Sequence, residues 1–132
     1  MNDVVVDTDI ASYVFKNHTL ASLYYREIRG GLAYLSFMTI AELRRWTLQA
    51  AWGKQRLQSL DEYLQGFVVI PSSPDLCEKW AEVTVAAQAA GRRIDCADAW
   101  IAATALLYDL PLITHNRTDY LGVPGLRVIS HA

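Results

Sequence analysis

One carboxylate in this sequence stands where a helix should be apolar. Residues 94–105 read as a helix with almost no polar side, and Asp98 shares a face with Ile101, Ala102 and Ala105. A helix normally buries such a face, and a buried carboxylate is costly unless a cation or strong donors replace its water. No Lys or Arg lies one turn away on that face. The sequence therefore predicts that a partner from elsewhere in the chain faces Asp98.

Short apolar runs and helical patterns alternate along the 132 residues. Strands are predicted at about 4–6, 32–36, 67–70, 112–114 and 126–129, and helices at about 10–16, 19–29, 39–52, 54–65, 74–91 and 94–110. This alternation indicates an α/β fold with a mainly parallel five-stranded sheet flanked by helices, in an α/β/α arrangement. The length fits one domain, which we expect to cover residues 1–132.

The predicted topology sends distant acidic residues to one edge of the sheet. Each helix starts where the preceding strand ended, so strand carboxyl ends and helix amino ends share a rim, and open α/β sheets bind ligands there. The polar residues expected on this rim are Asp7, Asp9, Glu42, Asp95, Asp98, Asn116 and Asp119.

Each of these residues also has a local explanation. Glu42 three residues after Thr39 makes a capping box, and Asp7 and Asp9 are good helix caps, with Thr8 or Asp9 expected to cap a helix from Ile10. Asp95 suits the amino end of the following helix, and Asp119 suits a turn. Local roles do not explain why four acids meet on one rim with Asp98 on an apolar face.

Several carboxylates within a few ångströms of each other repel and take up protons unless a divalent cation holds them ionised. Oxygen ligands without a His or Cys set suit Mg²⁺ or Mn²⁺ better than zinc. Such ions activate water and stabilise the leaving oxygen in phosphodiester hydrolysis. We therefore expect metal-assisted hydrolysis of a phosphate ester.

Composition limits the environment and the partners of the chain. The net charge of −2 argues against a broad polyanion-binding surface but allows a local one. No apolar run approaches the length of a membrane span, and residues 1–4 do not begin a secretory signal. Cys77 and Cys96 are isolated and read as reduced thiols. These features predict a cytoplasmic protein without a membrane segment.

Four blocks stand in order along the chain: residues 4–9 (VVVDTD), 39–43 (TIAEL), 98–105 (DAWIAATA) and 114–120 (THNRTDY), with Pro124-Gly125-Leu126 beyond. Together they resemble the PIN-domain ribonucleases, and within them the VapC-type toxins of type II toxin–antitoxin pairs. The resemblance covers essentially the whole chain. A single Asp-Thr-Asp after a strand carries little information, whereas four blocks at these separations are fairly specific.

The resemblance implies a set of catalytic and metal-binding acids, which fall on Asp7, Glu42, Asp98 and Asp119. Some members of the family have an acid at the position of Asn116, and Thr8 and Thr114 match polar positions of the pocket. The resemblance further implies a Mg²⁺- or Mn²⁺-dependent endoribonuclease that acts on RNA, usually as a homodimer, and is inhibited by a small antitoxin protein in the active-site groove.

The sequence departs from the family pattern at two acids. Asp9 stands where the family more often has a neutral Ser or Asn, and Asp95 adds a further negative charge near the site. Extra negative charge either strengthens metal binding or weakens the approach of RNA. We expect Asp95 to act as a helix cap or a supporting charge rather than as a metal ligand.

Two other functions compete with this hypothesis. A catalytically weak PIN-fold binding module would keep the fold without hydrolysis, although every expected acid position is filled. A haloacid-dehalogenase-type phosphatase would use Asp7 as a covalent nucleophile and Asp9 as an acid/base. Such phosphatases also need a catalytic Lys, and no Lys follows Lys79.

The tryptophans and His115 are expected to have structural rather than catalytic roles. His115 adjoins the rim and is predicted to be a solvent-facing loop residue. Trp80 and Trp100 are expected to be packing or dimer-interface residues, and Trp46 and Trp52 to lie at a dimer interface or an antitoxin groove rather than to stack on RNA bases.

Overall fold

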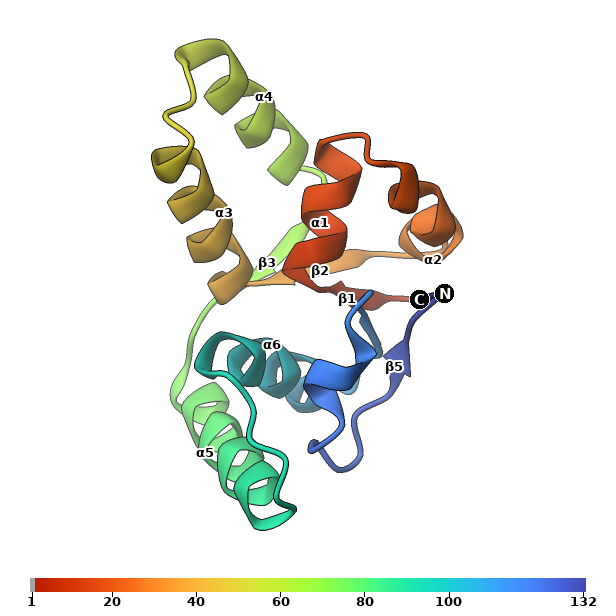
Figure 1. The fold of residues 1–132 in the computed structure, drawn as a ribbon, viewed down its shortest axis with the longest axis vertical. Helices are drawn as coiled ribbons and strands as arrows, with labels where there is room; N and C mark the ends of the chain where they lie inside the picture. The colour runs from red at the N-terminus through yellow and green to blue at the C-terminus, as the bar shows by residue number, and fades with distance from the viewer. Residues whose placement is uncertain (1) are drawn as a thin grey trace.

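The computed structural model, which describes residues 2–132, is built on a parallel sheet between two layers of helices (Figure 1). The sheet contains β1 (Val4–Val6), β2 (Ala33–Ser36), β3 (Val68–Ile70), β4 (Leu112–Ile113) and β5 (Val128–Ile129) in the order β3-β2-β1-β4-β5. All four strand pairs are parallel. The predicted α/β/α class and five-stranded sheet are therefore confirmed.

Helices cover both faces of this sheet. One layer contains α1 (Thr8–Phe15), the 3₁₀ helix η1 (Thr19–Tyr24), α2 (Tyr25–Arg29), α3 (Phe37–Gln49) and α4 (Lys54–Leu64), and the other contains α5 (Pro74–Ala89) and α6 (Cys96–Leu107) (Figure 1). A second 3₁₀ helix, η2 (Arg117–Tyr120), follows β4. In the described part of the chain no helix is long and apolar enough to cross a membrane.

The central strand β1 divides the core into two halves. Val4 and Val6 pack with the layer of α1, α3 and α4, whereas Val5 packs with α5 and α6. Successive strand side chains point to opposite faces of a sheet, so a strand covered on both faces must be apolar throughout. The uninterrupted valine run satisfies this requirement and fixes Asp7 at the carboxyl end of the central strand.

Several predicted helix boundaries are wrong. The first helix begins at Thr8 and not near Ile10, because Asp7 rather than Thr8 or Asp9 is its cap. Residues 19–29, predicted as one helix, form η1 followed by α2. The helix predicted to end near Trp52 stops at Gln49, because Ala51 turns into the left-handed region at a φ of 52°.

The helix that carries Asp98 is also shorter than predicted. It ends at Leu107 rather than Leu110, since Asp109 adopts a φ of 53°, and it begins at Cys96 with Asp95 at the N-cap position. Its face of Ile101, Ala102 and Ala105 is completely buried, as the spacing predicted. The predicted start of α5, with Ser73 as cap and Pro74 in the first turn, is confirmed.

Candidate active site

The acids gather where the direction of the chain through the sheet reverses. From β1 the chain builds β2 and β3 on one side and then returns to add β4 and β5 on the other. Neighbouring strands β1 and β4 run parallel, and Asp7 and Thr114 follow them directly. The carboxyl edge of an open sheet at such a switch point is a common ligand site because the two following segments diverge there.

Asp7 is the most deeply buried of these acids, with 6% of the residue exposed. As N-cap of α1 it accepts a hydrogen bond from the Thr8 backbone N–H at 2.8 Å. Its Oδ2 accepts from Thr114 Oγ1 at 2.7 Å and from the Tyr120 hydroxyl at 2.9 Å. Burial, followed by the charge of Asp9, raises the pKa of Asp7 from 3.8 to about 7 despite these donors.

Asp98 lies in the first turn of α6 and is half-buried. Its Oδ1 is 3.4 Å from the hydroxyl of Tyr120, which thus lies between Asp7 and Asp98. Burial raises the pKa of Asp98 from 3.8 to about 6, and the negative charges of Asp119, Asp95 and Glu42 add to that rise. The charges of acids from α6, η2 and α3 thus act together on Asp98.

Glu42 reaches the rim through a side-chain contact with α1. The Thr8 hydroxyl donates to Glu42 Oε1 at 2.7 Å and lies 2.9 Å from Thr39 Oγ1. The predicted capping box of Thr39 and Glu42 is wrong, because α3 begins earlier and its N-cap is Ser36, whose hydroxyl accepts from the Met38 N–H. Glu42 therefore lies in the second turn of α3 and takes no part in capping the helix.

Asp9, like Asp7, accepts hydrogen bonds from the protein at both of its oxygens. Oδ1 accepts from the Ile10 N–H at 2.7 Å, and Oδ2 accepts from the His115 N–H at 3.0 Å and from Asn116 Nδ2 at 2.9 Å. Burial raises the pKa of Asp9, although these donors oppose the shift. This extra acid therefore anchors the segment after β4 to the start of α1.

The two remaining acids are exposed. Asp119 lies in η2, and its negative charge raises the pKa of both Asp9 and Asp98. Asp95 occupies the N-cap position of α6 without making a capping hydrogen bond through its side chain. Its charge nevertheless acts on Asp98. The structure thus brings every acid predicted from the sequence to one rim.

Tyr120 is a site residue that sequence reasoning missed. It is buried, with 3% exposed, and its single hydroxyl proton faces two carboxylates. Burial, followed by the charges of Asp7 and Asp98, raises the pKa of Tyr120, so the phenol stays protonated as a donor. The only sequence signal is its place directly after Asp119, since a tyrosine in a loop is otherwise read as packing.

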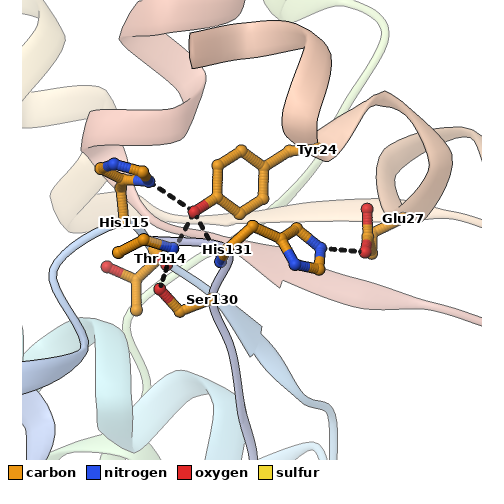
Figure 2. A network of polar contacts seen from close by, with 7 residues as sticks. Tyr24, Glu27, Thr114, His115, Ser130 and His131 are labelled. Atoms are coloured by element: carbon orange, nitrogen blue, oxygen red, sulfur yellow. Dashed lines mark hydrogen bonds and ion pairs between the residues drawn. The ribbon is translucent and has the colours of Figure 1, made fainter.

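A second polar network supports the segment after β4 from the opposite side (Figure 2). Tyr24 is fully buried, and its hydroxyl lies 2.6 Å from His115 Nδ1 and accepts from the His131 N–H at 3.0 Å. The His131 ring in turn pairs with Glu27 of α2. The prediction that His115 faces solvent is wrong, because Tyr13 and Tyr24 enclose its ring edge-on.

The donor set fits a divalent cation. Asp7 and Asp98 are desolvated, share one hydroxyl proton, and have no Lys or Arg among the groups that lower their pKa. Oxygen-rich, cation-free sets of this kind suit Mg²⁺ or Mn²⁺. Within residues 2–132, however, no three Asp, Glu, His or Cys side chains are already grouped tightly enough to form a ready metal centre.

Comparison with known proteins identifies the fold family. The family model described as the PIN domain matches residues 4–120. The chain belongs to the PIN-domain family. This PIN domain is 32% identical over 98 residues to Ribonuclease VapC4 of Mycobacterium tuberculosis, covering 73% of the chain and 75% of the relative. The phosphatase hypothesis receives no support from this match.

Solved structures give the same result. This PIN domain superposes on VapBC2 from Rickettsia felis, solved with a promoter DNA fragment, with a TM-score of 0.84 at 21% identity, covering 97% and 98% of the two chains. It superposes on a toxin–antitoxin complex from Klebsiella pneumoniae with a TM-score of 0.77 at 25% identity, covering 96% of each chain. These structures support the fold of the whole chain.

Proposed function

We propose that the protein is a Mg²⁺- or Mn²⁺-dependent endoribonuclease and the toxin of a type II toxin–antitoxin pair. The observation that carries the proposal is the pair of desolvated carboxylates, Asp7 and Asp98, joined through Tyr120 at the carboxyl edge of a PIN-domain sheet. The names of the relatives, which include Ribonuclease VapC4 and Ribonuclease VapC5, support RNA as the substrate.

We assign the metal to the four acids Asp7, Glu42, Asp98 and Asp119, because the charges of Glu42 and Asp119 act on Asp98 and the Tyr120 hydroxyl links Asp98 to Asp7. When bound, a divalent cation supplies a Lewis acid and a water of lowered pKa for attack on a phosphodiester. Tyr120 and Thr114 orient Asp7, and Thr8 orients Glu42, so the carboxylates are held before substrate arrives.

We further propose a small antitoxin protein as the partner. The support is that structural neighbours of this chain are described as VapBC and FitAB assemblies and as a toxin–antitoxin complex. The expected homodimer stays a prediction, which sedimentation analysis of the purified protein tests. The expected extent of the PIN domain, residues 1–132, also stays a prediction.

One observation favours the weaker alternative of a binding module. The described acids do not already enclose a metal position, which is what a domain that had lost catalysis would show. Against this alternative, Asp7 and Asp98 are desolvated carboxyl groups with raised pKa values and no Lys or Arg partner, a combination that clusters at functional sites.

Cleavage of RNA decides between the two functions. The wild type should cut a fluorescent RNA or a structured tRNA in Mg²⁺ or Mn²⁺ and lose activity in EDTA. Asp7→Asn should abolish cleavage, whereas Asp75→Asn, at an exposed acid of α5, should leave it unchanged. Circular dichroism would verify that both variants fold. Inactivity of the wild type across a broad RNA panel would reject the nuclease in favour of the module.

A further inference from the structure

A polar groove leads away from the acids between α1 and α3. It is a cavity of about 320 Å³ and we call it the α1–α3 groove. Asp9 and Glu42 line it at the rim, and Lys16, Arg45 and Trp46 line it further along. The groove is thus continuous with the candidate active site and changes its charge along its length.

The helix geometry separates the two ends. Asp9 is in the first turn of α1 and Lys16 is its C-cap, so seven residues place them about 10 Å apart along the axis. Arg45 lies one turn beyond Glu42 on α3. A strand whose phosphate sits at the acids would therefore reach the cationic end with a neighbouring part of its backbone.

Lys16 and Arg45 have no acidic partner among residues 2–132. The preceding residue on α3, Arg44, provides a contrast, since it pairs with Asp61 of α4 at 2.5 Å. Lys16 Nζ is instead placed over the Trp46 ring, 5.1 Å from its centroid. Trp52 packs edge-on against Trp46 with centroids 4.6 Å apart. Trp46 therefore positions an ammonium in the groove rather than offering that face to a base.

We propose that the α1–α3 groove is a subsite for the RNA backbone, in which Lys16 and Arg45 bind a phosphate next to the one held at the acids. The inference rests on the proposed function, because it extends that site. Charge complementarity points to the regularly spaced anions of a nucleic-acid backbone: Lys16 and Arg45 can bind one phosphate while another lies at the rim, where the proposed metal would offset the charges of the acids. A metal at the rim would bind one phosphate of a strand, and the side chains of Lys16 and Arg45 would bind a neighbouring phosphate of the same strand.

Two contacts of this kind have a measurable salt signature. Each phosphate contact to a single strand contributes roughly 0.7 to the slope of log affinity against log salt. Lys16→Ala and Arg45→Ala should each weaken RNA binding several-fold and lower that slope by about 0.7. In steady-state cleavage, both should raise KM with kcat little changed, because the contact is made equally before and during reaction.

The binding experiment uses the full chain carrying Asp7→Asn, so that no RNA is cut, in the absence of added metal. Fluorescence anisotropy of a short labelled oligouridylate is followed between about 50 and 200 mM salt. Lys16→Ala and Arg45→Ala are compared with Arg44→Ala as the matched control, and Arg45→Lys is the conservative variant. We expect Arg44→Ala to bind like the parent and Arg45→Lys to retain most of the affinity.

The outcomes separate this inference from the proposed function. Weaker binding in Lys16→Ala and Arg45→Ala supports the subsite even if the wild type cleaves nothing. Unchanged affinity and slope, an equal loss in Arg44→Ala, or no RNA binding by the parent would overturn it, even if the wild type is an active nuclease. If the groove instead seats a protein partner, the Lys16→Ala, Arg45→Ala double variant will bind and cleave RNA normally, which also overturns the proposal.

Discussion

Tyr24 offers the sharpest test of how the acids are held, because it touches none of them. Its buried hydroxyl joins His115 and His131, and the other side of the His115 segment holds Asp9 through a backbone N–H. Tyr24→Phe removes only this hydroxyl and keeps the ring in the core. We expect the variant to fold and to loosen the segment after β4.

The magnitude follows from the lost contacts. The substitution leaves the His131 N–H and His115 Nδ1 without their partner, and an unsatisfied buried group costs roughly 1–3 kcal/mol. Water reaches both histidines in part, so we expect the lower end, about 2 kcal/mol in total. For a chain of this size, that loss lowers the melting temperature by roughly 6–10 °C.

Thermal melting and amide exchange at His115 measure the two consequences. Tyr24→Phe should melt earlier and exchange the His115 N–H faster, since its bond to Asp9 is then less well held. Tyr108→Phe is the control, because Tyr108 is 48% exposed and its hydroxyl has no hydrogen bond among the described residues. An unchanged melting temperature together with unchanged His115 exchange would refute the reasoning.

Three further predictions concern the acids. Without metal, unfolding free energy should fall as pH rises from about 4 to 7, because folded Asp7 has a raised pKa of about 7 and binds a proton that the unfolded chain releases near 3.8. Chemical denaturation across that range measures this, and a rise instead would contradict it. Asp9→Asn should retain slow RNA cleavage where Asp7→Asn has none, because Asp9 anchors the segment after β4 and is not one of the acids assigned to the metal; equal inactivity in the two would count against that role. Expression in bacteria should arrest growth, and Asp98→Ala should relieve the arrest at equal protein level; normal growth with abundant wild-type protein would tell against the toxin.

Much of the fold could be predicted from local pattern. The valines of β1 have no alternation, which requires a strand covered on both faces, and a parallel sheet then sends Asp7 and Asp98 to the same edge. Helix ends were less predictable. Ser36 and Thr39 are both good caps, and the chain uses the first. Ala51 ends a helix in the left-handed conformation usually taken by glycine, and no local sequence pattern predicts this.

The parts of the site that sequence could not reveal depend on distant contacts. Tyr120 meets Asp7 across 113 positions, and Tyr24 meets His115 across 91. A tyrosine signals packing by its type, and only the fold shows that its hydroxyl reaches a carboxylate or an imidazole. Acids could be predicted because a carboxylate on an apolar face is costly in any fold, whereas a buried phenol is ordinary until its partners are known.

Calorimetric titration of the purified protein with Mn²⁺, at a pH above the value of about 7 for Asp7, tests the central claim most directly. We predict binding by the wild type and an affinity loss of more than about tenfold in Asp98→Asn, with Asp75→Asn unchanged. No binding by the wild type, or equal affinity in Asp98→Asn, would contradict the claim that these carboxylates form a metal site.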